Sequence, residues 1–356
     1  MRREIFREYD IRGIAGVDLT EETVELLGRG IGTMMRRHGK RMVTLGRDCR
    51  PSSDPFRDAL ATGMLAAGVS VIDAGIVPTP LLYFSILHCG ADGGVMITGS
   101  HNPSEYNGLK ICIGTDSVYG ERIQDIYRII QSGDFASGHG TLSTVDIIAP
   151  YSERIRGGIK LNRPVRIAVD CGNGTASLVA PDIMRSLGAE VTELYCTMDG
   201  SFPNHHPDPT IEGNLSDLQA CVQQGRLELG VAFDGDADRI GVIADDGTII
   251  WGDILLAIFA REILRKRPGA TFISEVKCSM NMYRDIEKNG GRAIMWKTGH
   301  SLIKAKMKEE KAVLAGEMSG HMFFADRYFG YDDAIYAACR LLELLSDLPV
   351  PLSGIL

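Results

Sequence analysis

The sequence has no run of about eighteen apolar residues, the length that a membrane-spanning helix needs. Its start, Met1-Arg2-Arg3-Glu4-Ile5-Phe6, lacks the apolar stretch of a secretory signal peptide. None of the eight cysteines stands in a C-x-x-C pair, and no low-complexity segment is found. We therefore expect a globular protein of the cytoplasm with reduced thiols and no membrane partner.

An excess of positive charge is also lacking. Lys and Arg number 38 against 46 Asp and Glu, which gives a formal net charge of −8. Nucleic acid is therefore an unexpected ligand, although a small anion could bind where cationic groups converge. At 356 residues, the chain is too long for one simple core and should form two or three domains.

What the sequence does have is a unit that recurs three times. Each unit is an apolar run, a polar turn, a helical pattern, a second strand, and a third strand that returns through a polar loop. The first strands are expected at 42–45, 165–169 and 271–276, the helices at 53–67, 176–187 and 282–289, the second strands at 69–72, 190–194 and 292–296, and the returning strands at 109–113, 240–244 and 322–325. Short apolar runs between periodic helices indicate parallel βα units.

The pattern predicts an α/β protein of three successive similar αβ domains, with mixed, largely parallel sheets flanked by helices. We place the domains at 1–145, 146–248 and 249–356. The three polar loops are Thr98-Gly99-Ser100-His101-Asn102-Pro103, Asp234-Gly235-Asp236-Ala237-Asp238-Arg239 and Gly316-Glu317-Met318-Ser319-Gly320-His321. Because ligands bind outside the ends of strands in such sheets, the three loops could face one shared cleft.

The second loop carries three alternating carboxylates, Asp234, Asp236 and Asp238. Carboxylates gathered in this way favour a hard cation such as Mg²⁺. The loop is not an EF-hand, because its sixth position is Arg239 rather than Gly and its twelfth is Asp245 rather than Glu. A solvated acidic turn is the simpler alternative.

The first loop offers Ser100 as a candidate nucleophile. It does not fit the G-x-S-x-G elbow of hydrolases, and the adjacent His101 is poorly placed as a triad base. On these residues alone, a plain turn with an Asn-Pro stop is the favoured interpretation. Lys110 on the returning strand favours the functional interpretation of Ser100, since it could offset phosphate charge or move a proton.

The third loop places Glu317 and Ser319 at alternate positions, where both side chains could bond sugar hydroxyls; a plain turn is the alternative. Cationic residues also recur near turns and indicate an anion-binding cleft, although each alone could be a solvated surface charge. They are Arg7, Arg12, Arg47, Arg50, Lys277, Lys297 and His300.

Together these residues resemble the α-D-phosphohexomutase superfamily, and within it the bacterial phosphomannomutase/phosphoglucomutase group. The resemblance runs from Tyr9-Asp10-Ile11-Arg12-Gly13 through the serine and metal loops to the third loop. It implies transfer of a phosphoryl group between the 1- and 6-positions of a small-molecule hexose phosphate, with hexose 1,6-bisphosphate as intermediate or activator. No obligate protein partner is implied.

The resemblance also assigns roles. Ser100 is similar to the phosphoserine, and Asp234, Asp236 and Asp238 to the Mg²⁺ ligands, with a phosphoryl oxygen on Ser100 completing the site. Glu317 and Ser319 match the pair that reads the sugar's 3- and 4-hydroxyls, and Lys110 and His321 match proton-transfer candidates. Positions that bind phosphate or orient the sugar are Tyr9, Arg12, His101, Asn102, Arg239, Lys277 and His300.

Two departures affect the expected substrate and activity. Phosphoglucosamine mutases usually have Ala before the serine, Gly between the second and third Asp, and Gln after the Glu, where this chain has Gly99, Ala237 and Met318. Mannose or glucose phosphate is therefore the expected substrate. The family's fourth, C-terminal phosphate-binding domain has no counterpart here, so we expect weak or absent mutase activity. A Mg²⁺-dependent phosphatase and a non-catalytic sugar-phosphate binding protein are the alternatives.

Overall fold

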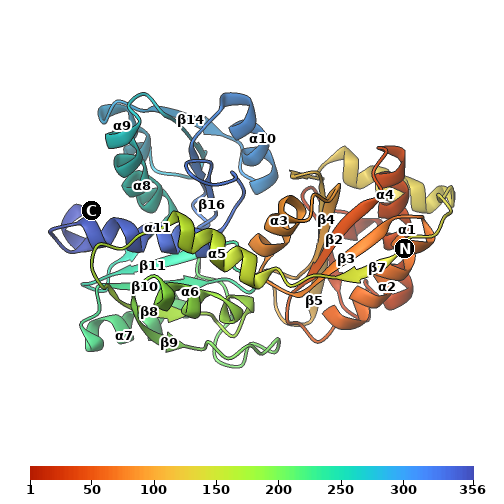
Figure 1. Cartoon of the computed structure of the whole chain (residues 1–356), viewed down its shortest axis with the longest axis horizontal. Coiled ribbons are helices and arrows are strands. Elements are labelled where there is room, and N and C mark those ends of the chain that lie inside the picture. Colours follow the sequence, from red (N-terminus) through yellow and green to blue (C-terminus); the bar gives the residue numbers. More distant parts are fainter. The chain divides into compact units, whose positions relative to one another are not determined.

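The computed structural model describes all 356 residues. Its contacts divide the chain into two compact units. The first unit is Met1–Tyr151 with Asp199–Ser201, and the second is Ser152–Met198 with Phe202–Leu356. The first unit contains one β-sheet and the second contains two, all with flanking helices (Figure 1). The predicted α/β class with three mixed sheets is confirmed, while the predicted domain boundaries stay predictions. No helix is both long and apolar enough to cross a bilayer.

The first unit is built on a seven-stranded sheet in the order β1-β5-β4-β2-β3-β7, with β6 beside β5. Its strands are β1 (Ile11–Ile14), β2 (Met42–Arg47), β3 (Ser70–Ile76), β4 (Gly93–Ile97), β5 (Tyr106–Ile113), β6 (Asp116–Ser117) and β7 (Leu142–Thr144). Its helices are η1 (Arg3–Ile5), α1 (Glu21–Arg37), α2 (Ser53–Ala66), α3 (Thr79–His88) and α4 (Glu121–Ser132), and α5 (Ile148–Gly158) begins in it.

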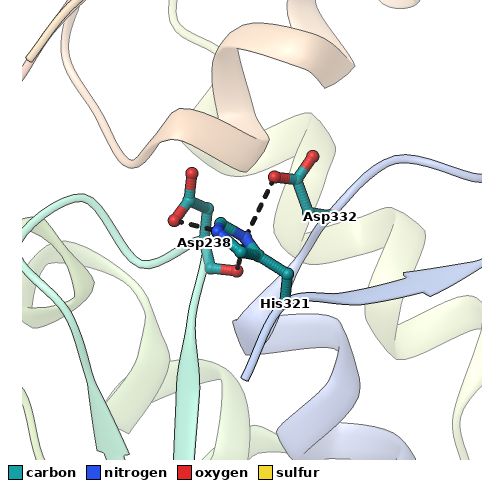
Figure 2. Close-up of side chains that lie close together, drawn as sticks. All are labelled: Asp238, His321 and Asp332. Carbon is teal, nitrogen blue, oxygen red and sulfur yellow. Dashed lines mark hydrogen bonds and ion pairs between the residues drawn. The ribbon is translucent and has the colours of Figure 1, made fainter. Parts of the chain in front are cut away.

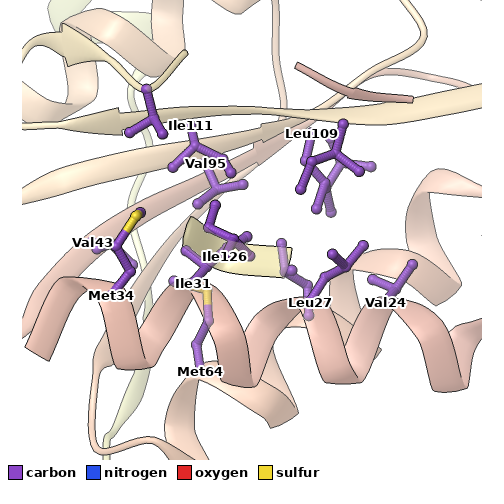
Figure 3. Packing of buried hydrophobic residues seen from close by; sticks show 14 of the residues in the cluster. Val24, Leu27, Ile31, Met34, Val43, Met64, Val95, Leu109, Ile111 and Ile126 are labelled. Atoms are coloured by element: carbon purple, nitrogen blue, oxygen red, sulfur yellow. The ribbon is translucent and has the colours of Figure 1, made fainter. Parts of the chain in front are cut away.

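The apolar side of α1 explains how this unit closes. Thr20 caps the helix by accepting a 3.2 Å hydrogen bond at Oγ1 from the amide of Thr23. Residues at helical spacing then form one buried stripe, which packs on side chains of β2, β4, β5, α2 and α4 (Figure 3). The stripe is Val24, Leu27, Ile31 and Met34. Each such side chain contributes roughly 1.5–3 kcal/mol on burial.

The second unit contains two smaller sheets, with the orders β12-β11-β10-β8-β9 and β14-β13-β15-β16. The strands are β8 (Arg166–Asp170), β9 (Glu190–Leu194), β10 (Leu229–Phe233), β11 (Ile240–Ala244), β12 (Ile249–Ile250), β13 (Thr271–Glu275), β14 (Arg292–Trp296), β15 (Leu314–Gly316) and β16 (Met322–Phe324). The helices are η2 (Thr175–Leu178), α6 (Ala180–Ser186), η3 (Glu212–Leu215), α7 (Ser216–Gly225), α8 (Gly252–Lys266), α9 (Met280–Lys288), α10 (His300–Glu310), α11 (Ala334–Asp347) and η4 (Leu352–Ile355).

Helices α8 and α11 join these two sheets, because each contacts strands of both. Nearly every side chain of α11 is buried, as expected for a helix covered on several sides. Its first turn is capped by Asp333, whose Oδ1 accepts a 2.8 Å bond from the amide of Tyr336. The two sheets and their loops therefore share one packed body.

All three sheets repeat one strand order, as the recurring sequence unit predicts. A central strand (β2, β8 or β13) has a parallel neighbour on each side, and one of these neighbours pairs with an antiparallel strand. The antiparallel pairs are β4–β5, β10–β11 and β15–β16. The three polar loops connect the strands of these pairs, so they occupy equivalent places in three sheets.

Several predicted elements differ from the structure in their bounds, and two of the differences have a clear physical reason. The helix expected at 176–187 is split into η2 and α6, because Val179 leaves the helical region at φ −142° and a new helix begins at Ala180, with Pro181 in its first turn. The strand expected at 109–113 begins earlier, at Tyr106, because residues Tyr106 to Leu109 pair with β1. That pairing joins segments far apart in the chain, which the local pattern does not reveal.

Candidate active site

The serine loop lies between β4 and β5 of the first unit. Ser100 is buried and has φ +50°, a left-handed conformation that non-glycine residues seldom adopt. Its amide donates a 2.8 Å hydrogen bond to Oγ1 of Thr98, and its Oγ lies 3.2 Å from Nδ1 of His101. A buried, strained backbone of this kind is typical of functional sites.

Two further candidates lie beside this loop. Arg12 on β1 donates from Nη1 to Oδ1 of Asn102 at 2.6 Å, and its Nη2 pairs with Asp10 at 2.5 Å. Lys110 is buried on β5 opposite Met96. The structure therefore brings Arg12, Asn102, Ser100 and His101 together, and Tyr9 directly precedes Asp10, the partner of Arg12.

The expectation that Arg47 and Arg50 belong to an anion cleft is not supported by their contacts. Arg47 pairs with Asp54 at 2.5 Å and with Asp73 at 3.4 Å. Arg50 is fully buried and bonds Asp48 and the main chain of the serine loop. Proximity to a strand end is a local feature of the sequence, whereas burial depends on the whole unit.

The loop from Asp234 to Arg239 connects β10 and β11 in the second unit, and we call it the metal loop after its predicted cation. The carboxylates of Asp234, Asp236 and Asp238 are buried, and each offers an oxygen within 4.8 Å of the others. Oδ1 of Asp234 accepts bonds from the amides of Asp238 and Arg239 at 3.1 and 3.2 Å, which closes the loop. An all-oxygen anionic set of this size fits Mg²⁺.

The loop's own cation is Arg239. Burial opposes its charge, but Asp234 and Asp238 raise the pKa of Arg239 above its ordinary value. One arginine does not balance three buried carboxylates, whose mutual repulsion a divalent cation would relieve. The donor set and its charge thus agree with the predicted Mg²⁺ site.

His321, directly before β16, lies against this loop (Figure 2). Its Nε2 accepts a 3.0 Å bond from Nε of Arg239. Its Nδ1 lies 3.1 Å from the carbonyl oxygen of Asp238 and 3.2 Å from Oδ2 of Asp332. In this geometry the ring proton lies on Nδ1. Burial lowers the pKa of His321, but the nearby Asp238 and Asp332 have the larger effect. Together they hold the pKa of His321 above its ordinary value.

Asp332 is a residue that the sequence reasoning missed. It is fully buried after β16, 3.1 Å from Nζ of Lys304 and 3.9 Å from Nδ1 of His300. Burial raises its pKa, but Lys304 and the histidines hold the pKa of Asp332 well below its ordinary value. With Asp238 and His321 it also has the spacing of a cation site, although Mg²⁺ favours the all-oxygen triad. In the sequence, Asp332 is only one of two adjacent acids in Tyr331-Asp332-Asp333. Because paired acids are common in turns, this pattern does not indicate a functional role.

The third loop connects β15 and β16. Oε1 of Glu317 accepts a 2.8 Å bond from the amide of Gly299, and Oε2 accepts a 3.2 Å bond from Oγ of Ser319. Gly320 has φ +93°, and an added Cβ would lie 2.3 Å from the carbonyl oxygen of Ile240. Because Ile240 begins β11, the third loop lies against the end of the metal loop.

A second missed residue, Glu275, supports this loop. It is fully buried at the end of β13 and accepts a 3.0 Å bond from the amide of Met318. Its Oε2 lies 3.5 Å from Nζ of the exposed Lys277.

The rings of His300 and His321 stack with centroids 5.7 Å apart. The second unit therefore gathers the metal loop, the third loop, His300 and His321, while a cleft shared by all three loops stays a prediction.

Three sheets of one strand order, with a buried carboxylate triad on the loop of the second, define the protein class of the phosphohexomutases. Comparison with known families agrees. Residues 3–137, 149–247 and 251–356 match the alpha/beta/alpha domains I, II and III of phosphoglucomutase/phosphomannomutase. The chain belongs to the phosphoglucomutase/phosphomannomutase family, and it is an enzyme of the mutase type, an isomerase.

Individual relatives support this assignment. A phosphomannomutase/phosphoglucomutase of Pseudomonas aeruginosa is 49% identical over 343 residues, covering 96% of this chain and 74% of the relative. A phosphoglucomutase of Neisseria gonorrhoeae is 47% identical, covering 97% and 75%. A crystal structure of a family member from Burkholderia thailandensis, 44% identical, superposes with a TM-score of 0.97 and covers 100% of this chain and 79% of that one.

Proposed function

We propose that this chain moves a phosphoryl group between the 1- and 6-positions of mannose or glucose phosphate, with Ser100 as the carrier. The observation that best supports this is the buried oxygen triad of Asp234, Asp236 and Asp238, with Arg239 and His321 against it. Phosphoryl transfer depends mainly on positioning and on charge neutralisation, which such a set supplies. The names of the relatives, phosphomannomutase and phosphoglucomutase, agree with this substrate class.

The proposed reaction has two half-steps. In the first, the P–Oγ bond of phospho-Ser100 breaks and Oγ takes up a proton, while a P–O bond forms to a sugar hydroxyl whose proton passes to a base, giving a hexose 1,6-bisphosphate. In the second, Oγ gives up its proton as the other phosphoryl group returns to it, and the freed sugar oxygen regains a proton. Lys110 and His321 are the candidates for these proton transfers.

Mg²⁺ would be held by the three aspartates, and when bound it supplies charge stabilisation to the transferring group. Glu317 and Ser319 would read the sugar hydroxyls, since both side chains carry oxygens on one side of the same loop. The residues proposed to bind phosphate or to orient the sugar are Tyr9, Arg12, His101, Asn102, Arg239, Lys277 and His300.

A half-reaction tests this proposal directly. The purified chain is incubated with Mg²⁺ and glucose 1,6-bisphosphate, and the mass of the protein and the sugar products are measured. We expect one phosphoryl group on Ser100 and release of glucose monophosphate, with no gain in S100A. Free inorganic phosphate as the main product would instead favour a phosphatase. No protein phosphorylation and no Mg²⁺ binding would favour a non-catalytic binding protein.

A further inference from the structure

Arg50 and Asp48 lie directly beneath the serine loop, and we infer that Arg50 is a positioning residue for Ser100. This inference rests on the proposed role of Ser100 as phosphoryl carrier. Arg50 follows β2, while Ser100 follows β4, its neighbour in the sheet. The two residues are therefore held at the same edge of one sheet by strand pairing.

The guanidinium of Arg50 bonds four carbonyl oxygens of the loop. Nη2 donates to the carbonyl oxygens of Ser100 and Asn102 at 2.8 and 2.6 Å. Nη1 donates to the carbonyl oxygen of Tyr106 at 3.0 Å and also to that of Pro103. One rigid planar group thus fixes both ends of the segment from Ser100 to Tyr106.

The remaining N–H of the guanidinium, at Nε, donates to Oδ2 of Asp48 at 3.0 Å. A guanidinium has five N–H donors, and these five contacts account for them all. Arg50 therefore has no donor left for a substrate phosphate, and its side chain is fully buried. Its proposed role is to hold the loop, not to bind phosphate.

Asp48 completes the arrangement from the other side. Its Oδ2 also accepts a 3.0 Å bond from the amide of Gly99, while Oδ1 accepts from the amide of Arg50 at 3.1 Å and from Oγ of Ser53 at 2.5 Å. The pair therefore bonds the main chain at positions 99, 100, 102, 103 and 106. Ser100 keeps its left-handed backbone within this frame.

The backbone of the serine loop approaches the guanidinium of Arg50 closely at Gly99. A Cβ added to Gly99 would lie 2.5 Å from Cζ and 2.6 Å from Nε of Arg50. The loop backbone thus rests on the guanidinium itself. A methyl group at this position would move the guanidinium, the loop or both.

The test separates positioning from simple stabilisation. Phosphoryl transfer from glucose 1,6-bisphosphate to Ser100 is followed by quenched-flow mass spectrometry in the full chain, for the wild type and for R50K and R57K. Arg57 is the matched control, because it pairs with Asp73 at 2.7 Å in the same unit and bonds no part of the serine loop. Thermal unfolding establishes that each variant is folded at the assay temperature.

R50K keeps the charge but loses the planar fork, so we expect transfer slowed by about tenfold to a hundredfold. R57K should transfer at the wild-type rate even if its melting temperature falls. Equal transfer rates in R50K and wild type would overturn the inference while leaving the role of Ser100 intact. A wild type that never gains a phosphoryl group would overturn both.

A second arm decides the question if R50K does not fold. G99A is compared with G157A, which adds the same methyl group at a glycine that has open space around it and no positive φ. We expect G99A to slow transfer, because its methyl group would displace the guanidinium of Arg50 or the loop, and G157A to transfer at the wild-type rate. Wild-type transfer rates in a folded G99A variant would contradict the inference.

Discussion

Nε of Arg239 donates a 3.0 Å hydrogen bond to Nε2 of His321, and this bond joins the metal loop to the last residue of the third loop. Because Nε2 accepts, the ring proton is held on Nδ1, between the carbonyl oxygen of Asp238 and the carboxylate of Asp332. His321 can therefore act as a base through Nε2 only when Arg239 releases that atom. A substrate phosphate that attracts Arg239 would provide this release.

The first prediction concerns His321 itself. H321A should slow phosphoryl transfer between Ser100 and sugar by about a hundredfold or more, the usual contribution of a positioned base. H38A, a histidine on the first unit bonded only to the end of α1, is the control and should be unchanged. Single-turnover measurements with glucose 1,6-bisphosphate provide the rates, and an H321A rate equal to wild type would exclude His321 as the base.

The second prediction concerns Asp332. D332N removes the buried charge that Lys304 and His321 share, which leaves Lys304 without its counterion at 3.1 Å. We expect the free energy of unfolding to fall by about 3 kcal/mol. Urea denaturation measures this loss, and D347N, on the exposed end of α11, should change stability by under about 0.5 kcal/mol. Similar losses in both variants would refute the role given to Asp332.

The third prediction concerns the aspartate triad. Mg²⁺ should raise the melting temperature of the wild-type chain, because a ligand that binds only the folded state stabilises it by mass action. D236N should lose most of that increase, and without Mg²⁺ it should be no less stable than wild type, since one repelling charge is gone. D246N, an exposed turn aspartate, should keep the full response. An undiminished Mg²⁺ shift in D236N would place the cation elsewhere.

The fourth prediction is a pH dependence outside the site. Nε2 of His205 lies 3.0 Å from Oδ2 of the buried Asp170. Although burial opposes it, the bond to Asp170 raises the pKa of His205 above its ordinary value of 6.5. The stabilisation is therefore fully present below pH 6.5 and is lost as pH rises through the folded-state pKa.

The difference in unfolding free energy between wild type and H205N should accordingly shrink from pH 6 to pH 8.5. A constant difference for H205N across this range would mean that the ring is neutral throughout.

Much of the fold could be predicted because it depends on local patterns. Apolar runs such as Gly93–Ile97 are strands, and the polar loops that follow them connect antiparallel pairs. Contacts between distant segments could not be predicted in this way. The pairing of β1 with β5 joins Arg12 to Gly108, and it lengthens β5 beyond its apolar run.

The same limit applies to the site. The residue types in the sequence predict the loops that hold Ser100 and the aspartates. They do not predict the residues that hold these loops in place. In the sequence, Glu275 is an ordinary acid at the end of a strand. Its role depends on the pairing of β13 with β15, which places the amide of Met318 where it can donate to Glu275. The sequence places Arg50 among the cations of an anion-binding cleft, and only its burial beneath the serine loop reveals its contacts.

The central claim is that Ser100 carries the phosphoryl group, and peptide mass spectrometry tests it most directly. The chain is incubated with Mg²⁺ and glucose 1,6-bisphosphate, digested, and compared with the same sample after addition of excess mannose 1-phosphate. We predict one phosphoryl group on the peptide that contains Ser100, lost to the added sugar phosphate and absent in S100A. Phosphorylation at another residue, or a phosphoryl group on Ser100 that the sugar never removes, would contradict the account.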